Sequence, residues 1–221
     1  MELSTELARF NMIEQQIRPW EVLDRRVLHL MGSIPRELFV PEAYRNLAYA
    51  DVEIPIGSGQ TMLAPRIVGR MLQALAVRSQ EKVLEIGAGT GYLTACLARL
   101  GANLVSLELR PELLEAARRN LAAMGAPSAE IRQGDGLAVI PDESPFDAIA
   151  ITGSLPSEEL LPRLQMQLRV GGRLFVVVGE DPLMEALLIT RVSETGYSRE
   201  ALFETSIPTL DNAPEPRRFQ F

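Results

Sequence analysis

The chain has 221 residues, a formal net charge of −7 and 47% hydrophobic residues, which is enough for one domain with a full core. Its acidity argues against a general nucleic-acid binder and against a basic patch for anionic membranes, since both need clustered Lys and Arg. The single cysteine, Cys96, allows neither an internal disulfide nor a Cys-based metal site, so no metal is predicted. Residues 1–20 lack an apolar signal region and no stretch approaches the ~18 apolar residues of a membrane span. We therefore expect a cytoplasmic protein.

The N-terminal third of the chain indicates helices followed by an irregular stretch. Apolar residues recur at helical spacing over 5–31, but Arg18-Pro19-Trp20 interrupts them, which predicts two helices with a turn. Proline and glycine punctuate residues 34–63, and residues 65–77 read as a helix again. We expect residues 1–80 to form an extension with a substrate loop, packed over the ligand-binding edge of a sheet.

From residue 82 onward, strands and helices alternate. Strands are predicted at 82–86, 103–108, up to 131, 146–151 and 173–178, with helices at 92–100, 111–124 and about 158–168. Two later strands, near 185–192 and 201–207, complete the pattern. This alternation predicts an α/β, Rossmann-like, doubly wound and mainly parallel sheet of about seven strands, with helices on both faces. Residues 1–221 are expected to form a single domain, of which 81–221 are the cofactor-binding core and C-terminal strands.

A glycine-rich turn follows the first of these strands directly. It reads Glu85-Ile-Gly87-Ala-Gly89-Thr-Gly91 and precedes a helix. Glycines allow positive φ and let the main chain approach a ligand closely. The spacing differs from the Gly-x-Gly-x-x-Gly of a dinucleotide site. A carboxylate at Glu85 suits a cationic ligand and would repel a pyrophosphate.

Two further acidic signals lie at the ends of the next strands. Glu108 ends the second strand, where a carboxylate can accept both ribose hydroxyls of an adenosine. Asp135 follows the third strand, within Gly134-Asp135-Gly136. The three signals together indicate one cofactor site.

These motifs resemble those of the class I methyltransferases that use S-adenosylmethionine. The resemblance implies that Glu85 lies near the amino-acid end of the cofactor and the Gly-Asp-Gly turn beside its adenine. The cofactor-binding residues so implied are Glu85, Gly87, Ala88, Gly89, Thr90, Gly91, Glu108, Leu109, Gly134, Asp135 and Gly136.

The flanking segments are similar to those of protein-L-isoaspartate O-methyltransferases. They are Phe39-Val-Pro41, the loop Pro-Ile-Gly-Ser-Gly-Gln-Thr-Met-Leu-Ala-Pro over 55–65, and residues 146–152 and 168–174. The similarity covers about residues 10–207. It implies transfer of the sulfonium methyl group to the α-carboxylate of an isoaspartyl residue in a damaged protein or peptide. A carboxylate is already ionised at neutral pH, so no general base is required.

The sequence departs from that family on the substrate side. Leu63 stands where Ser or Thr is usual, Arg66 where His or Tyr is common, and Thr152-Gly153-Ser154 where Thr-Ala-Ala is usual. The candidates for contacts with the substrate or the methionine end are Thr61, Arg66, Thr152 and Ser154.

Three alternatives remain open from the sequence. A divergent relative would methylate another acceptor, such as a small metabolite, which Leu63 motivates. A non-catalytic module would bind only the cofactor or a protein partner. A nicotinamide dehydrogenase disagrees with the loop spacing and with Glu85. Oligomeric state is left undetermined.

Overall fold

A seven-stranded sheet forms the centre of the protein, whose computed structural model describes residues 2–125 and 129–216. The strand order is β5-β4-β3-β6-β7-β8-β9. The strands are β3 (Lys82–Ile86), β4 (Asn103–Glu108), β5 (Glu130–Gln133), β6 (Phe146–Leu155), β7 (Leu168–Glu180), β8 (Leu183–Arg191) and β9 (Tyr197–Thr205). The first five are parallel, and β8 and β9 are antiparallel to their neighbours. The predicted fold class is confirmed.

The sheet separates two apolar cores, because its central strands bury side chains on both faces. Along β6, Ala148 and Ala150 face one core, while Ile149 and Ile151 face the other. Helices α3 (Pro65–Leu75), α4 (Tyr92–Arg99) and α5 (Pro111–Met124) contribute to the first core, and α6 (Leu161–Met166) to the second. Helices α3 and α5 each begin with proline, whose fixed φ suits the first turn.

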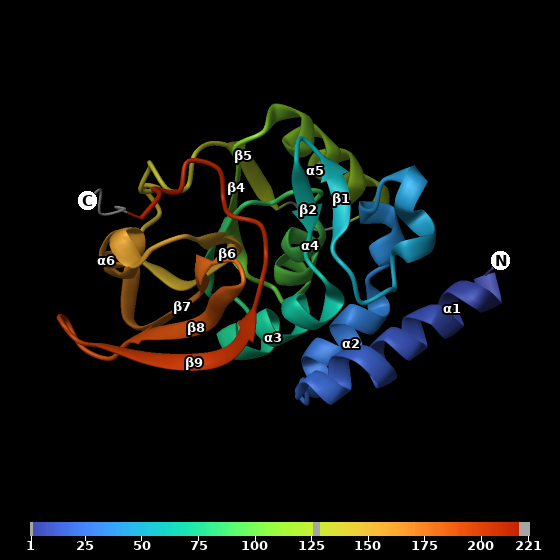
Figure 1. The fold of residues 1–221 in the computed structure, drawn as a ribbon, viewed down its shortest axis with the longest axis horizontal. Helices are drawn as coiled ribbons and strands as arrows, with labels where there is room; N and C mark the ends of the chain where they lie inside the picture. Colours follow the sequence, from blue (N-terminus) through green and yellow to red (C-terminus); the bar gives the residue numbers. More distant parts are fainter. Residues whose placement is uncertain (1, 126–128, 217–221) are drawn as a thin grey trace.

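The N-terminal helices lie at the opposite end of the molecule from α6 and the antiparallel strands (Figure 1). Helix α1 (Glu2–Asn11) continues through a π-helical turn, Met12–Ile17, and a 3₁₀ turn, Arg18–Trp20, before α2 (Arg25–Ser33). The predicted break at Arg18-Pro19-Trp20 is therefore confirmed. Among the described residues, no helix combines the length and apolar character needed to cross a membrane.

The stretch over 34–63 contains more structure than its prolines and glycines suggested. Two 3₁₀ turns, η3 (Arg36–Phe39) and η4 (Glu42–Leu47), precede a hairpin of β1 (Ile54–Gly57) and β2 (Gln60–Met62). Ile54 pairs with Met62 in this hairpin. Both side chains are buried, so the hairpin is held by apolar packing that a local reading of turn residues does not reveal.

The C-terminal segment after β9 returns across the ends of the parallel strands (Figure 1). Ser154 anchors it: the Ser154 amide donates to the Pro208 carbonyl at 2.9 Å, and the Leu210 amide donates to the Ser154 carbonyl at 3.0 Å. The segment thereby lies beside β6 and the loop that follows β3, since a Cβ on Gly153 would be 2.8 Å, and a Cβ on Gly87 3.5 Å, from the Leu210 side chain.

Candidate active site

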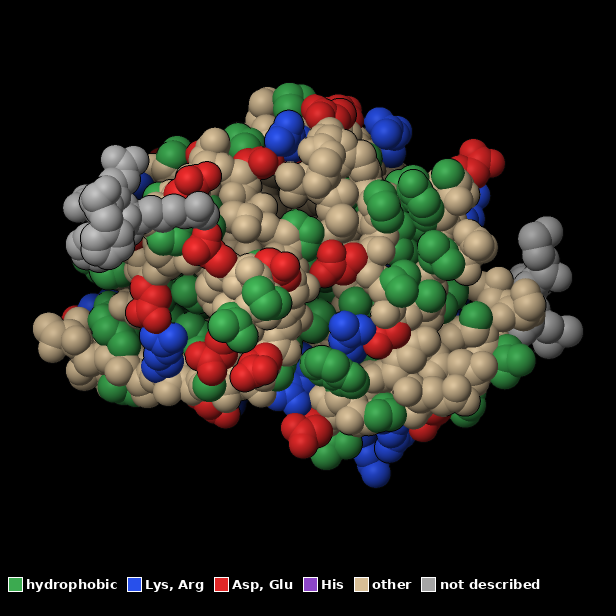
Figure 2. Space-filling view, in the orientation of Figure 1, with side chains coloured by type: hydrophobic (Ala, Val, Ile, Leu, Met, Phe, Trp, Pro, Cys, Tyr) green, Lys and Arg blue, Asp and Glu red, His purple; other side chains and the backbone are tan. Residues whose placement is uncertain are grey.

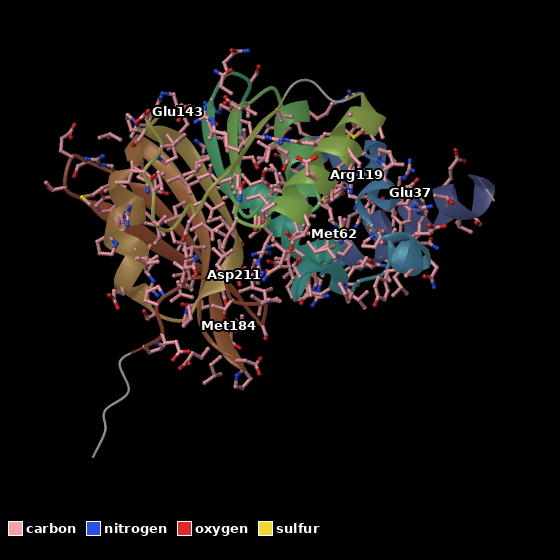
Figure 3. All side chains as sticks on the ribbon, turned by 90° about the horizontal axis from the view of Figure 1, so that it is seen from above. Glu37, Met62, Arg119, Glu143, Met184 and Asp211 are labelled. Carbon is pink, nitrogen blue, oxygen red and sulfur yellow. The ribbon has the colours of Figure 1, made fainter. Side chains whose placement is uncertain are left out.

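A cleft opens at the carboxyl ends of β3, β4 and β6, where successive connections leave the sheet in opposite directions. Such a switch point is where ligands bind in open α/β sheets. The cleft measures about 930 Å³ including its opening to solvent, within the usual range of a small-molecule site. Its walls come from the loop after β3, the ends of β4 and β6, the hairpin and the C-terminal segment. Met62 of the hairpin and Asp211 of the C-terminal segment, both lining it, are labelled in Figure 3.

The glycine loop forms the floor of the cleft with its main chain. Gly87 and Gly89 have φ values of 91° and 56°, which glycine adopts without steric cost. The amides of Gly87 and Ala88 donate to the Leu107 carbonyl at 2.9 and 3.1 Å, which fixes the loop against β4. Gly87, Ala88, Gly89 and Thr90 all line the cleft.

Gly91 differs from the other loop glycines because it does not line the cleft. It precedes α4 with a φ of 93°, and a Cβ there would lie 3.2 Å from the Cβ of Ala117 on α5. The structure places Gly91 against α5, and its contact with the cofactor stays a prediction. Gly91 is needed for the close approach of the loop to α5.

Glu108 is a buried carboxylate at the end of β4, and it lines the cleft. Its two oxygens accept the Gly89 amide at 2.7 Å and the Arg110 amide at 2.9 Å. Burial raises the pKa of Glu108, and the main-chain hydrogen bonds lower it. The effect of burial is the larger, so the pKa lies above its usual value. Each carboxylate oxygen has a second acceptor site, so the side chain can still accept hydroxyl groups of a ligand.

The turn after β5 supplies the next wall. Gly134, Asp135 and Gly136 line the cleft together with Leu109. Asp135 accepts the Leu137 amide at 2.9 Å and, through its other oxygen, the Asn212 side-chain amide at 2.8 Å. A Cβ on Gly136 would lie 2.7 Å from the Ile86 side chain, so this turn packs directly against the end of β3.

Glu85 does not line the cleft, so its placement near the amino-acid end of the cofactor stays a prediction. Its side chain is wholly buried, and one carboxylate oxygen accepts the hydroxyls of Thr94 at 2.6 Å and Ser106 at 2.5 Å. Burial raises its pKa to about 7. Side chains on successive strand residues point to opposite faces, and that alternation places the Glu85 carboxyl among the neighbours on α4 and β4.

The four candidate substrate residues divide into two pairs. Thr61 and Thr152 line the cleft. The Thr61 hydroxyl donates to Glu53 at 3.3 Å, and the Thr152 hydroxyl donates to the Gly87 carbonyl at 2.6 Å. The structure thus brings together the end of β6, the glycine loop and the hairpin.

Arg66 and Ser154 are not among the residues that line the cleft, and their substrate contacts stay predictions. The Arg66 guanidinium pairs with Asp51 at 2.6 Å and stacks over Trp20, 4.8 Å from the ring centroid. Ser154 is wholly buried, and its hydroxyl bonds the Ile207 carbonyl and the Thr209 hydroxyl, both at 3.2 Å. Arg66 thus connects α3 to the segment before the hairpin, and Ser154 connects β6 to the C-terminal segment.

The sequence analysis did not find several other cleft residues, most of which are apolar and carry no motif. Ile56 and Met62 of the hairpin line the cleft beside Leu63, as do Pro208, Leu210 and Asp211 of the C-terminal segment. Asp211 accepts Arg110 at 2.9 Å and Gln60 at 3.3 Å. The only signal for the hairpin residues was the similarity of the 55–65 loop. The C-terminal residues had none.

The charged side chains among the described cleft-lining residues are Glu108, Asp135 and Asp211, all acidic. Figure 2 shows Asp and Glu side chains near the middle of the face that Figure 1 views. The acidic part of the cleft is suited to a ligand that donates hydroxyl hydrogen bonds, because carboxylates accept them. Leu107, Leu109 and Leu137 provide apolar surface beside them, as a nucleobase requires.

The strand order, the glycine loop after β3 and the acidic end of β4 define a class I methyltransferase that depends on S-adenosylmethionine. A sequence profile described as "Protein-L-isoaspartate(D-aspartate) O-methyltransferase (PCMT)" matches residues 8–206. The chain belongs to this family.

Similar sequences agree with the assignment. The chain is 41% identical to protein-L-isoaspartate O-methyltransferase 2 of Anaeromyxobacter sp. (strain Fw109-5), over 89% of this chain and 80% of the relative. It is 46% identical to a protein-L-isoaspartate O-methyltransferase of Methanoculleus marisnigri, over 77% of each chain.

Solved structures share the fold. A protein-L-isoaspartate O-methyltransferase superposes with a TM-score of 0.80 at 24% identity, covering 94% of this chain and 67% of its own. A putative family member from Plasmodium falciparum, in complex with S-adenosyl-L-homocysteine, superposes with a TM-score of 0.79 at 21% identity. It covers 94% of this chain and 98% of its own.

Proposed function

We propose that the protein transfers the methyl group of S-adenosylmethionine to the α-carboxylate of an isoaspartyl residue in a protein or peptide. The observation that carries this proposal is the closure of the cleft by the hairpin, which sets the Gln60–Leu63 segment opposite the glycine loop. A carboxylate admitted between them is ionised at neutral pH and is itself the nucleophile. The chain therefore has to position the acceptor and does not have to deprotonate it.

The cofactor residues fit the proposed ligand by shape and by chemistry. S-adenosylmethionine, when bound, supplies an electrophilic methyl group on a sulfonium. We assign the hydroxyls of its ribose to Glu108, whose oxygens keep free acceptor sites in addition to their main-chain partners. Leu109 and the turn over 134–136 flank the adenine, and the main chain of 87–90 takes the methionine end. Side chains at Gly87 and Gly89 would occupy this space, since a Cβ on Gly89 would lie 3.1 Å from Ile56.

The chain's own contribution to the reaction is positioning and exclusion of water. The Thr152 hydroxyl commits its proton to main-chain carbonyls of the loop, so it holds the loop in place and offers only acceptor sites to the cleft. Ile56, Met62 and Leu63 form an apolar wall from the hairpin side. Such a wall keeps water away from the reacting groups and strengthens electrostatic interactions within the cleft.

The direct test is methyl transfer from labelled S-adenosylmethionine to matched isoaspartyl and aspartyl peptides. We expect label only in the isoaspartyl peptide, in a form released by base, as methyl esters are. Binding of S-adenosylhomocysteine measured by calorimetry is the control for an intact cofactor site. Cofactor binding without transfer to the isoaspartyl peptide would reject the proposed acceptor.

Leu63 is the observation that favours a second candidate, methylation of a different acceptor such as a small metabolite. It lines the cleft where a hydroxyl is usual in the family, and leucine offers no hydrogen bond there. Equal labelling of the two peptides at background level, combined with transfer to a small carboxylic acid, would support this candidate.

A further inference from the structure

Arg36 is a buried cation directly behind the hairpin wall of the cleft. It lies at the start of η3 with no exposed surface. Its Nε donates to the Ala48 carbonyl at 2.9 Å and its Nη2 to the Leu63 carbonyl at 2.6 Å. The guanidinium also lies over the ring of Tyr92, 4.7 Å from the ring centroid.

No carboxylate among the described residues forms an ion pair with Arg36. Its third nitrogen, Nη1, is buried and has no partner at full hydrogen-bond geometry in the described part of the chain, and the polar side-chain group that interacts with the guanidinium is the neutral Tyr92 hydroxyl. Burial lowers the pKa of the guanidinium, but arginine stays protonated in proteins. Burying a charge without a counter-ion costs free energy. Hydrogen bonds to two carbonyl groups do not require a formal charge, so we infer that the charge of Arg36 has a function beyond these hydrogen bonds.

The cleft lacks what Arg36 would supply. The charged side chains among its described lining residues are Glu108, Asp135 and Asp211, which repel an anion. Leu63 and Tyr92 line the cleft and also contact Arg36, so the guanidinium lies directly behind residues of the cleft wall. The Leu63 carbonyl oxygen is held by Arg36, which keeps its partial negative charge directed onto the guanidinium.

We propose that Arg36 is a positioning residue for the acceptor: its buried, unpaired charge makes the hairpin end of the cleft electropositive and selects an ionised carboxylate over a neutral group. This inference rests on the proposed function. In a low-dielectric interior, a charge acts over several ångströms with little screening. Arg36 thereby compensates the acidic lining without touching the substrate, and it does so where Leu63 provides no hydroxyl donor.

The test compares binding of two peptides to the protein saturated with S-adenosylhomocysteine. One peptide carries an isoaspartyl residue with its free α-carboxylate, and the other carries the same residue with a neutral α-carboxamide. We expect the wild type to bind the carboxylate peptide about tenfold more tightly, equivalent to about 1.4 kcal/mol. The ratio of the two affinities is the decisive quantity, because a purely structural defect weakens both peptides alike.

Three substitutions and one control measure the role of the charge. Arg36→Met and Arg36→Gln remove the charge, and the Gln variant keeps an amide donor for the main-chain carbonyls if Met prevents folding. Both are expected to bring the affinity ratio close to one, whereas Arg36→Lys should retain most of it. Arg173→Met is the control, because Arg173 also donates to main-chain carbonyls, those of Leu75, Ala76 and Asp147, but lies away from the cleft and has its charge paired with Glu81. It should lower stability and leave the ratio unchanged.

The outcomes separate this inference from the proposed function. If a neutral Arg36 variant keeps the wild-type ratio, the inference is overturned, and the proposed function stands on the wild-type preference. If the wild type binds S-adenosylhomocysteine but neither prefers the carboxylate peptide nor methylates it, the proposed function fails and the inference fails with it.

Discussion

The hydroxyl of Thr152 donates a hydrogen bond to the main-chain carbonyl of Gly87, with 2.6 Å between the two oxygens. The same hydroxyl lies 3.0 Å from the Ile86 carbonyl. This contact joins β6 to the loop after β3. The strand order reverses between β3 and β6, because β4 and β5 lie on one side of β3 and the later strands on the other. The floor of the cleft is therefore fixed by a contact between residues far apart in the sequence.

Gly87→Ala should abolish or strongly weaken cofactor binding. The added Cβ would collide with the Thr152 hydroxyl, and Gly87 has a φ of 91° that alanine rarely adopts. We expect S-adenosylhomocysteine to bind at least about tenfold more weakly by calorimetry, since the strain alone is about 1–2 kcal/mol. Gly125→Ala is the control: Gly125 has a φ of 64° but open space around it. It should lower stability and leave cofactor affinity intact, and equal loss of affinity in both variants would contradict the prediction.

Replacing Glu85 by glutamine should change how stability depends on pH. Burial raises the pKa of Glu85 from 4.5 to about 7, so the folded state holds a proton that the unfolded state releases between these values. The resulting stabilisation is complete below pH 4.5 and is lost as the pH rises through about 7. The difference between the two pKa values corresponds to about 3 kcal/mol of unfolding free energy.

Chemical denaturation of wild type and Glu85→Gln between pH 5 and 8 measures the effect. Because glutamine does not titrate, the variant should become more stable relative to the wild type by about 3 kcal/mol as the pH rises. Two unfolding curves that stay parallel over this range would show that Glu85 does not titrate there.

Arg66→Ala should lower stability without impairing acceptor binding. The guanidinium pairs with Asp51 and stacks on Trp20, both outside the cleft. Loss of the partly exposed ion pair and of the cation–π contact is expected to cost about 1–2 kcal/mol of unfolding free energy. A double-mutant cycle with Asp51→Ala isolates the ion pair. A large rise in peptide KM at unchanged stability would restore Arg66 to the acceptor site.

Leu63→Ser should raise the specificity constant for isoaspartyl peptides relative to Leu63→Ala. Both variants open the same cavity where Leu63 is buried, so both should lose about 2–4 kcal/mol of stability. Only serine adds a donor for a carboxylate, worth about 1 kcal/mol or roughly fivefold in kcat/KM. Equal kcat/KM values for the two variants would indicate that the acceptor carboxylate does not approach residue 63.

The sequence by itself determined the fold class and most of the cofactor side of the cleft. Alternating buried strands and amphipathic helices specify a parallel sheet, and the glycine loop, Glu108 and Asp135 each follow a strand whose end lies at one edge of that sheet. These signals are local, because the turn chemistry and the strand that precedes it occupy a few consecutive residues.

Only the tertiary structure decided which of the candidate side chains reach the cleft. Glu85, Gly91, Arg66 and Ser154 all lie close in sequence to cleft residues but face other elements, while Leu210 and Asp211 arrive from the far end of the chain. Adjacent residues of a strand point to opposite faces, and long-range packing chooses the neighbours of each face. The environment of Arg36 is decided in the same way, since its contacts with Ala48, Leu63 and Tyr92 exist only once η3, the hairpin and α4 have packed together.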